Sequence, residues 1–225
     1  MPPSSATASA APALAALAAL AAGAPDCKTH PLLSPAACGV AKAPDAYNVT
    51  WTISASGARK NVTIRVLRKD APLGVDRFYN LAKLHYFDGT TESGNACGFF
   101  RVVSGFVTQF GISGLPAVSG AWQNLNIKDD PVLLSNVRGT ISYATAGPDT
   151  RTTQLFINTA NNPGLDGQGF APFGTISEED MKSIDLINAQ YAQEPDQDQI
   201  YAKGDAYLKQ SFPKLDYILD TFVLL

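Results

Sequence analysis

A short β-rich stretch around Gly105 combines residue types that can bind and polarise a ligand. At a strand's period of two, Arg101, Val107 and Gln109 fall on one face of a sheet. Gly105 allows a bend or bulge that brings Phe106 to the same face. This face would carry a guanidinium and an amide above an apolar floor. The alternative is an edge-strand arginine whose charged head simply reaches water.

A second stretch, residues 139–158, contains two predicted strands on either side of a Gly-Pro turn. Gln154 and Phe156 share a face there, because they stand at i and i+2 of a strand. Taken alone, Phe106 and Phe156 are better explained as core residues. The polar side chains that accompany them, Arg101 among them, favour a binding site instead.

The two stretches, together with residues that follow them, resemble the cyclophilins, which are peptidyl-prolyl cis-trans isomerases. Several motifs occur in the family's order, so the resemblance is more specific than any one short pattern. It covers roughly residues 47–225, is weaker after about Met181, and is strongest to divergent, bacterial-like members. The matching motifs are Phe99-x-Arg101-Val-Val-x-Gly105-Phe106-x-x-Gln109, Ala144-x-Ala146-Gly147-Pro148-x-Thr150, Gln154-x-Phe156-Ile157, Leu165-Asp166-Gly167 and Phe173-Gly174.

The resemblance implies a role for each residue that matches a family motif. Arg101 corresponds to the catalytic arginine, and Gln109 to the glutamine that orients it and contacts the substrate carbonyl. Phe106 completes the predicted catalytic group and, with Phe156, lines the pocket for the proline ring. The predicted substrate-binding residues are Val107, Ala144, Thr145, Gln154, Phe156, Leu165 and Phe170.

The chain also departs from the best-known members at the predicted pocket. Val107 replaces the usual methionine, which leaves a shallower but still apolar contact. Gly164 stands where those members have a tryptophan that donates a hydrogen bond to cyclosporin, so we expect weak inhibition by this drug. The pocket histidine is missing, and Phe170 is its predicted aromatic substitute.

The resemblance implies an enzyme that rotates Xaa-Pro bonds in flexible segments of client proteins and so assists their folding. Arg101 would stabilise the twisted amide in a surface groove, with no metal and no cofactor. The alternative is a catalytically weak module that binds proline-containing peptides as a chaperone or scaffold. Arg101 and Gln109 favour catalysis, whereas Gly164 and the missing histidine keep the alternative open.

Composition indicates one globular domain and gives little support to other activities. The 225 residues are 45% hydrophobic and 16% charged, enough to form a substantial core. A net charge of -3 and a pI near 5.3 give no electrostatic case for nucleic acid. The only histidines are His30 and His85, and no nucleophile elbow or closely spaced Cys/His set accompanies them.

Residues 1–26 consist almost wholly of Ala, Pro, Ser and Leu, with no charge before Asp26. Their apolar run is too short to span a membrane and is typical of a secretory signal, although a basic n-region is lacking. An Ala-rich disordered leader or an organelle-targeting segment is the alternative. We therefore expect a monomer in the secretory pathway or outside the cell, with an organelle lumen or the cytoplasm as alternatives.

Residues 27–46 are predicted to be a Pro/Ala-rich linker, followed by the isomerase domain at residues 47–225. Cys27 and Cys38 are close enough in sequence to form a small disulfide loop in an oxidising compartment, which would leave Cys97 unpaired. Three unpaired thiols are equally compatible with the sequence.

Hydrophobic periodicity locates the elements that must position these residues. Alternation around Ser56-Gly57 predicts a β-hairpin, and helical spacing after Pro72 predicts a helix to about Leu84. An imperfect capping box at Ser177 predicts a second helix. The remaining predictions are a site strand at residues 99–111, a long loop at 112–128, a polar excursion at 190–204, a short helix at 206–212 and a closing strand at 221–225.

Many short strands without regular β-α alternation indicate a mainly β sandwich or barrel. The family resemblance narrows this to a closed eight-stranded antiparallel β-barrel capped by two helices, one over each open end. Side chains fill the interior of a barrel of that size, so the predicted groove lies on its outer face.

Overall fold

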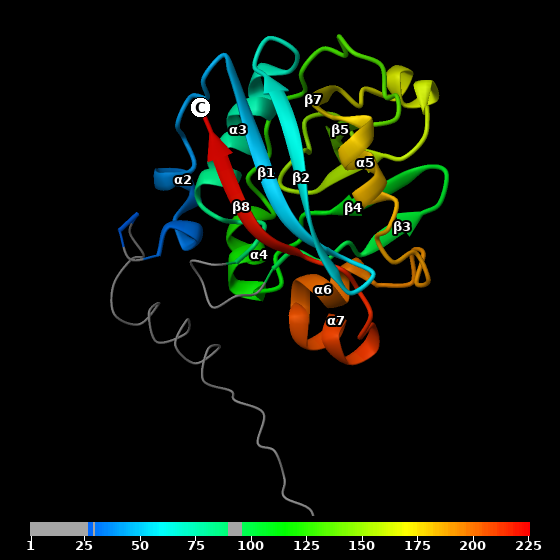
Figure 1. The fold of residues 1–225 in the computed structure, drawn as a ribbon. Helices are drawn as coiled ribbons and strands as arrows, with labels where there is room; N and C mark the ends of the chain where they lie inside the picture. The colour runs from blue at the N-terminus through cyan, green and yellow to red at the C-terminus, as the bar shows by residue number, and fades with distance from the viewer. Residues whose placement is uncertain (1–26, 29, 90–95) are drawn as a thin grey trace, which may run out of the picture.

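A two-residue turn at Ser56 and Gly57 joins the two longest strands, β1 (Ala46–Ala55) and β2 (Ala58–Leu67). Both turn residues have positive φ, 49° and 82°, the backbone that tight hairpins require. The computed structural model describes residues 27–28, 30–89 and 96–225 (Figure 1). The predicted hairpin is confirmed, whereas the predicted leader lies outside the described residues.

The described residues form one antiparallel eight-stranded sheet in the order β3-β4-β6-β5-β7-β2-β1-β8. Alternate residues of the hairpin, such as Val49, Trp51 and Ile53, point inward and are fully buried. The Trp51 ring makes edge contacts with aromatic rings from other elements, which fills the centre of the core. The other strands are β3 (Arg101–Val103), β4 (Val107–Phe110), β5 (Thr140–Tyr143), β6 (Leu155–Asn158), β7 (Pro172–Ile176) and β8 (Ile218–Leu224).

The sheet curls into an open half-barrel, so the prediction of a closed barrel is wrong. Its edge strands β3 and β8 form no common ladder, and a single bridge between Gly98 and Tyr217 joins the chain just before them. The Val102 N–H of β3 donates instead to the Ala192 carbonyl, 2.8 Å away. The segment after residue 190 therefore occupies a hydrogen-bonding position that closure would need.

The two helices predicted to cover the sheet are present. Helix α3 (Pro72–Lys83) packs against β7 and β8 and buries Phe78 and Leu81. Helix α5 (Glu178–Ile184) packs against β2, and its N-cap Ser177 accepts a hydrogen bond from the backbone N–H of Asp180.

Three further helices lie at one end of the sheet, where α6 and α7 are neighbours (Figure 1). Helix α7 (Asp205–Ser211) confirms the predicted short helix. Helix α4 (Pro116–Trp122) lies in the predicted loop, and α6 (Gln197–Lys203) in the predicted polar excursion. Those two predictions were wrong because tertiary burial outweighs local composition: Trp122 and Ile200 are buried. A second apolar cluster beneath α6 and α7 consists of Phe100, Ile112, Ile200, Leu208, Phe212 and Leu215.

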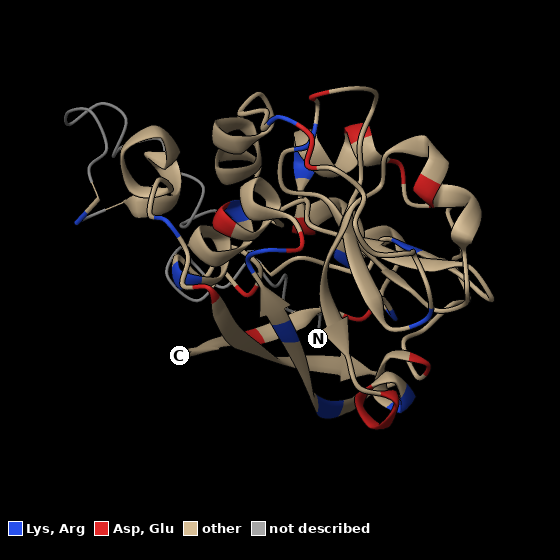
Figure 2. Cartoon of the chain, turned by 90° about the horizontal axis from the view of Figure 1, so that it is seen from above, with Lys and Arg blue, Asp and Glu red and all other residues tan. Residues whose placement is uncertain are grey.

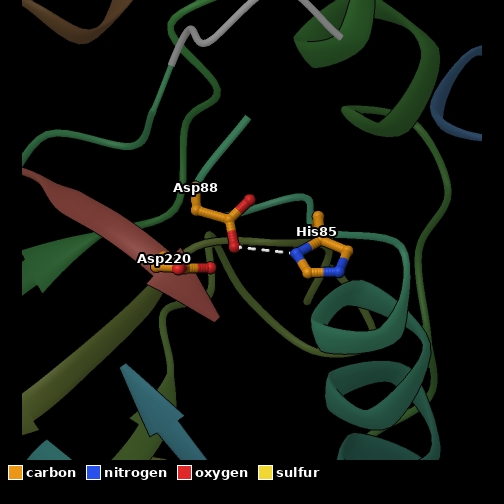
Figure 3. Close-up of side chains that lie close together, drawn as sticks. All are labelled: His85, Asp88 and Asp220. Atoms are coloured by element: carbon orange, nitrogen blue, oxygen red, sulfur yellow. Dashed lines mark hydrogen bonds and ion pairs between the residues drawn. The ribbon is translucent and has the colours of Figure 1, made fainter. Parts of the chain in front are cut away.

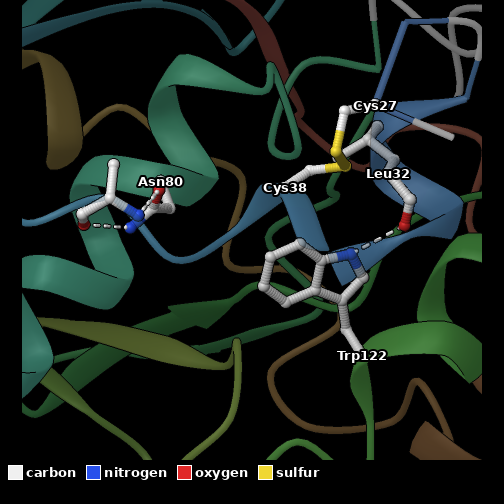
Figure 4. The surroundings of a disulfide bond; sticks show 6 residues. Cys27, Leu32, Cys38, Asn80 and Trp122 are labelled. Atoms are coloured by element: carbon white, nitrogen blue, oxygen red, sulfur yellow. Dashed lines mark hydrogen bonds between the residues drawn. A yellow bond between two sulfur atoms is a disulfide. The ribbon is translucent and has the colours of Figure 1, made fainter. Parts of the chain in front are cut away.

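The segment predicted as a linker packs against the domain. Cys27 and Cys38 form a disulfide around the short helices η1 (Pro31–Leu33) and α2 (Pro35–Cys38), and Cys97 is free and buried. The Trp122 indole N–H donates to the Leu32 carbonyl over 2.9 Å (Figure 4). Burial of Leu32, rather than local composition, orders this segment.

None of the helices in the described part of the chain has the length and apolar character needed to cross a bilayer.

Candidate active site

The hairpin of β3 and β4 positions the predicted catalytic arginine. Arg101 lies directly opposite Gln109, and its Nη1 donates to the Gln109 Oε1 over 3.1 Å. Gly105, at φ +70°, lies in the turn between the strands. The expected bend within one strand is therefore a full chain reversal, and cross-strand pairing places the two side chains on one face.

Strand β6 extends this polar row. Phe156 lies opposite Gln109 in the β4–β6 ladder. The Gln109 Nε2 donates to the Oε1 of Gln154, just before β6, over 2.8 Å. Arg101, Gln109 and Gln154 thus form a continuous hydrogen-bonded chain across the outer face of the sheet.

An apolar pocket of about 170 Å³ lies beside this chain. The Arg101 guanidinium faces the Phe106 ring, with 5.8 Å between its central carbon and the ring centre. Phe156 and Phe170 meet edge to face, with 5.4 Å between their ring centres, so the Phe170 ring forms part of the aromatic wall. The pocket is lined by Arg101, Phe106, Val107, Gln109, Ala144, Thr145, Phe156, Leu165 and Phe170.

The 3-10 helix η2 (Pro163–Gln168) holds one wall of the pocket. The Asp166 carboxylate accepts hydrogen bonds from the Ser135 hydroxyl and from the backbone and side-chain nitrogens of Asn136, at 2.5 to 2.8 Å. The Asn136 Nδ2 also donates to the Phe170 carbonyl. These bonds, led by that from Ser135, lower the pKa of Asp166 and fix the loop that carries Leu165.

The turn after β5 forms the opposite wall. The Ala144 N–H donates to the Gln154 carbonyl over 3.0 Å. The hydroxyl oxygens of Thr145 and Thr150 lie 2.8 Å apart, and both lie within hydrogen-bond distance of the Gly147 carbonyl, so one hydroxyl donates to the other and the second donates to that carbonyl. This hydroxyl network fixes the shape of the turn.

A second cavity of about 310 Å³ adjoins the first and shares Gln109, Ala144 and Thr145 with it. Gln154, the one predicted site residue absent from the apolar pocket, lines this cavity. The other residues that line it are Gln123, Ala146, Thr150, Thr152, Gln197 and Tyr201.

Sequence reasoning missed Gln123, which follows α4, and the α6 residues Gln197 and Tyr201, because their segments were predicted to be a loop and an excursion. One local signal for α6 was present: Asp196 stands three residues before Gln199, as an N-cap residue does before N3. The Asp196 carboxylate accepts the Gln199 N–H over 3.0 Å. No local signal connects Gln197 or Tyr201 to the groove.

No carboxylate in the described part of the chain forms an ion pair with Arg101. Elsewhere acidic and basic residues are interspersed along the chain (Figure 2), and several form ion pairs, as Arg138 does with Glu178 and Asp185. The charge of Arg101 therefore remains available to a ligand in the groove.

The histidine that follows α3 lies outside both cavities. The His85 Nδ1 contacts the buried Asp88 carboxylate at 3.0 Å, with Asp220 of β8 nearby (Figure 3). The potential ligand atoms of these three residues lie within 4.8 Å of one another. None of the three residues lines either cavity, so we assign this cluster no role in the groove.

Gly164 is exposed, and an added Cβ there would meet no other atom within 4 Å. Gly164 lines neither cavity, and weak inhibition by cyclosporin stays a prediction.

The curled antiparallel sheet and its outer groove define a cyclophilin-like fold. A cyclophilin-type isomerase from Cryptosporidium parvum has a similar solved structure, with a TM-score of 0.57 and 18% sequence identity over 80% of this chain and 98% of that one. At this identity the likeness concerns the fold alone.

Sequence comparison identifies the family. Residues 50–204 match the family described as cyclophilin type peptidyl-prolyl cis-trans isomerase. A peptidyl-prolyl cis-trans isomerase of Helicobacter pylori strain J99 is 34% identical over 128 residues, 56% of this chain and 74% of the relative. A peptidyl-prolyl cis-trans isomerase-like 1 protein of Rhizopus delemar is 31% identical over 121 residues, 52% of this chain and 68% of the relative. The chain belongs to the cyclophilin-type peptidyl-prolyl cis-trans isomerase family.

Proposed function

We propose that this chain is a peptidyl-prolyl cis-trans isomerase whose active site is the groove around Arg101. Membership of an isomerase family supports the activity. The location of the active site is supported by one observation: Gln109 holds the Arg101 guanidinium beside an aromatic pocket. The substrates are flexible, proline-containing segments of client proteins.

The reaction requires rotation about an amide with partial double-bond character. Resonance opposes this rotation with a barrier of about 18–20 kcal/mol. At the twisted geometry the proline nitrogen regains a lone pair, which accepts a hydrogen bond that neither planar isomer accepts. A donor placed beside that nitrogen therefore stabilises the transition state selectively. No covalent bond is broken, and no proton is transferred.

Each part of the groove has one task in this mechanism. The aromatic pocket holds the proline ring while the peptide on the other side of the bond turns. Arg101 donates to the proline nitrogen through its guanidinium, which presents several N–H donors in a fixed planar arrangement. Gln109 accepts one guanidinium N–H and so orients the other donors toward the pocket.

A proline-peptide-binding module with little turnover is the second candidate. It is favoured by the exposed Gly164 and by the absence of histidine from the residues that line the pocket. Such a pocket encloses its ligand less completely.

Isomerisation of a short Xaa-Pro peptide by the purified full chain separates the two candidates. We expect Arg101→Ala to lower kcat/KM on the order of a hundredfold, because it removes a charge-assisted contact made in the transition state. Arg101→Lys should restore only part of the rate, because a lysine lacks the fork that Gln109 orients.

Arg65→Ala is the matched control, since Arg65 is exposed on β2 outside the groove. It should leave the rate unchanged. A folded wild-type chain that binds the peptide without isomerising it would instead favour the binding module.

We also propose that the chain works as a monomer in an oxidising compartment of the secretory route or outside the cell. The composition of residues 1–26 and the Cys27–Cys38 disulfide support this location.

A further inference from the structure

Helix α6 forms a wall of the second cavity, beside the apolar pocket. Gln154 Nε2 donates to the Gln197 Oε1 over 3.1 Å and to the Tyr201 hydroxyl over 3.2 Å. The hydrogen-bonded chain from Arg101 through Gln109 therefore ends on α6.

The position of α6 is strongly determined by packing. Asp196 caps its N-terminus, and Ile200 is fully buried in the second apolar cluster. At its C-terminus, Gly204 has φ +55° and lies against the backbone of Gly114, to which the Asp205 N–H donates over 2.8 Å. The wall is thus an ordered part of the groove rather than a loosely attached loop.

The lining of this cavity is polar but carries no charged residue. Gln197 Nε2 and the Tyr201 hydroxyl hydrogen donate to no other group in the described part of the chain, and neither does the Gln123 side chain. Burial raises the pKa of Tyr201, so its hydroxyl remains a donor at neutral pH. The cavity therefore offers uncharged donors and acceptors to a ligand.

This lining discriminates between classes of side chain. An amide or hydroxyl can pair with the glutamines and the tyrosine. An apolar side chain would leave those groups without partners, and a charged one would find no opposite charge.

Building on the proposed function, we propose that Gln197 and Tyr201 make the second cavity a specificity subsite for an uncharged polar side chain, an amide or a hydroxyl, near the isomerised proline. The two cavities share three lining residues, so the recognised side chain lies within about two residues of the proline at the spacing of an extended chain. The preferred substrates are then proline-containing segments with Asn, Gln, Ser or Thr close to the proline.

The test uses the full chain and a set of peptides with one Xaa-Pro bond. Each position within two residues of the proline carries Gln, Leu, Glu or Lys in turn. At one position we expect kcat/KM for Gln to exceed that for Leu about threefold to tenfold, the effect of a hydrogen bond between neutral groups.

Tyr201→Phe and Gln197→Ala should each bring the Gln-to-Leu ratio toward one, by lowering kcat/KM for the Gln peptide more than kcat/KM for the Leu peptide. A purely structural effect of the substitution would lower kcat/KM for all the peptides by the same factor. Gln199→Ala, on the same helix but outside the groove, should keep the wild-type ratio.

A wild-type chain with no preference for Gln, or a preference that survives both variants, would overturn the subsite. Peptide binding, followed by NMR titration, is measured in parallel. If the folded chain isomerises no peptide but binds Gln peptides best, and Tyr201→Phe removes that preference, the isomerase proposal fails and the subsite stands.

Discussion

Arg101 differs from other arginines of the described chain in the kind of partner that it has. Its partners are the neutral side-chain amides of Gln109 and Gln193, which orient the guanidinium without neutralising it. An arginine paired with a carboxylate would have to give up that partner to serve a substrate. Three arginines that are paired in this way are Arg68 with Asp76, Arg138 with Glu178 and Asp185, and Arg151 with Asp129 and Asp130.

The contribution of Asp166 to the stability of the fold should depend on pH. Hydrogen bonds to the Asp166 carboxylate lower its pKa below the ordinary 3.8, because they favour the charged form. The bond from Ser135 has the largest effect, and those from Asn136 follow. The stabilising contribution of Asp166 is therefore complete above the unfolded pKa, near 4, and is lost as the pH falls through the lower folded value.

Titration of the Asp166 carboxyl by NMR measures this directly. We expect a midpoint below 3.8 in the wild type and a rise toward 3.8 in Ser135→Ala. Ser104→Ala, an exposed serine in the β3–β4 turn, should leave the midpoint unchanged. An ordinary wild-type midpoint would contradict the assigned role of these hydrogen bonds.

At the scale of elements, α6 and the chain that precedes it change the edge of the groove. The carbonyl of Ala192 occupies the edge of β3, and the Gln193 side chain accepts from the Arg101 Nε at 3.4 Å. One segment therefore blocks closure of the sheet and also forms part of the groove. The glycine that ends α6 holds this arrangement in place.

Gly204→Ala should displace α6. A Cβ there would overlap the Gly114 carbonyl oxygen, and the φ of +55° is unfavourable for alanine. We expect a loss of about 1–3 kcal/mol in the free energy of unfolding by urea, together with a weaker preference for Gln peptides.

Gly120→Ala in α4 is the control, because an added Cβ there meets nothing within 4 Å. It should be neutral or stabilise the chain by about 0.5–1 kcal/mol. Equal stability of the two variants would show that position 204, at the end of α6, tolerates a side chain.

At the scale of the whole molecule, the segment before β1 is attached to the domain outside the two cavities of the groove. The disulfide closes a loop over a sequence separation of 11, and the Leu32 carbonyl accepts the Trp122 indole N–H. None of the described residues between positions 27 and 46 lines either cavity of the groove. The segment should therefore affect stability rather than catalysis.

Replacing both Cys27 and Cys38 by serine should lower the free energy of unfolding by about 2–3 kcal/mol, because the unfolded chain gains the freedom of an open loop. Urea unfolding measures this loss, and the isomerisation rate should not change. Reduction of the wild type should reproduce the loss, with buried Cys97 reacting with thiol reagents only on unfolding. An unchanged midpoint, or lost catalysis, would contradict this account.

Local periodicity in the sequence determined the first hairpin, α3, α5 and α7, and it grouped Arg101 with Gln109 and Gln154 with Phe156. Each of these predictions depends on residues a few positions apart, where backbone geometry alone decides which side chains share a face. The family motifs then joined the two stretches into one predicted site, whose residues meet around two adjoining cavities.

Only the tertiary structure decided the open edge of the sheet, the pairing of Cys27 with Cys38 and the contribution of α6 to the groove. Tyr201 meets Gln154 across 47 positions of sequence, and no periodicity extends over such a distance. Burial of Ile200 brings its polar segment against the domain, and burial of Leu32 does the same for the Pro/Ala-rich segment before β1. Long-range packing of this kind depends on the shape of the whole core, which local propensity does not encode.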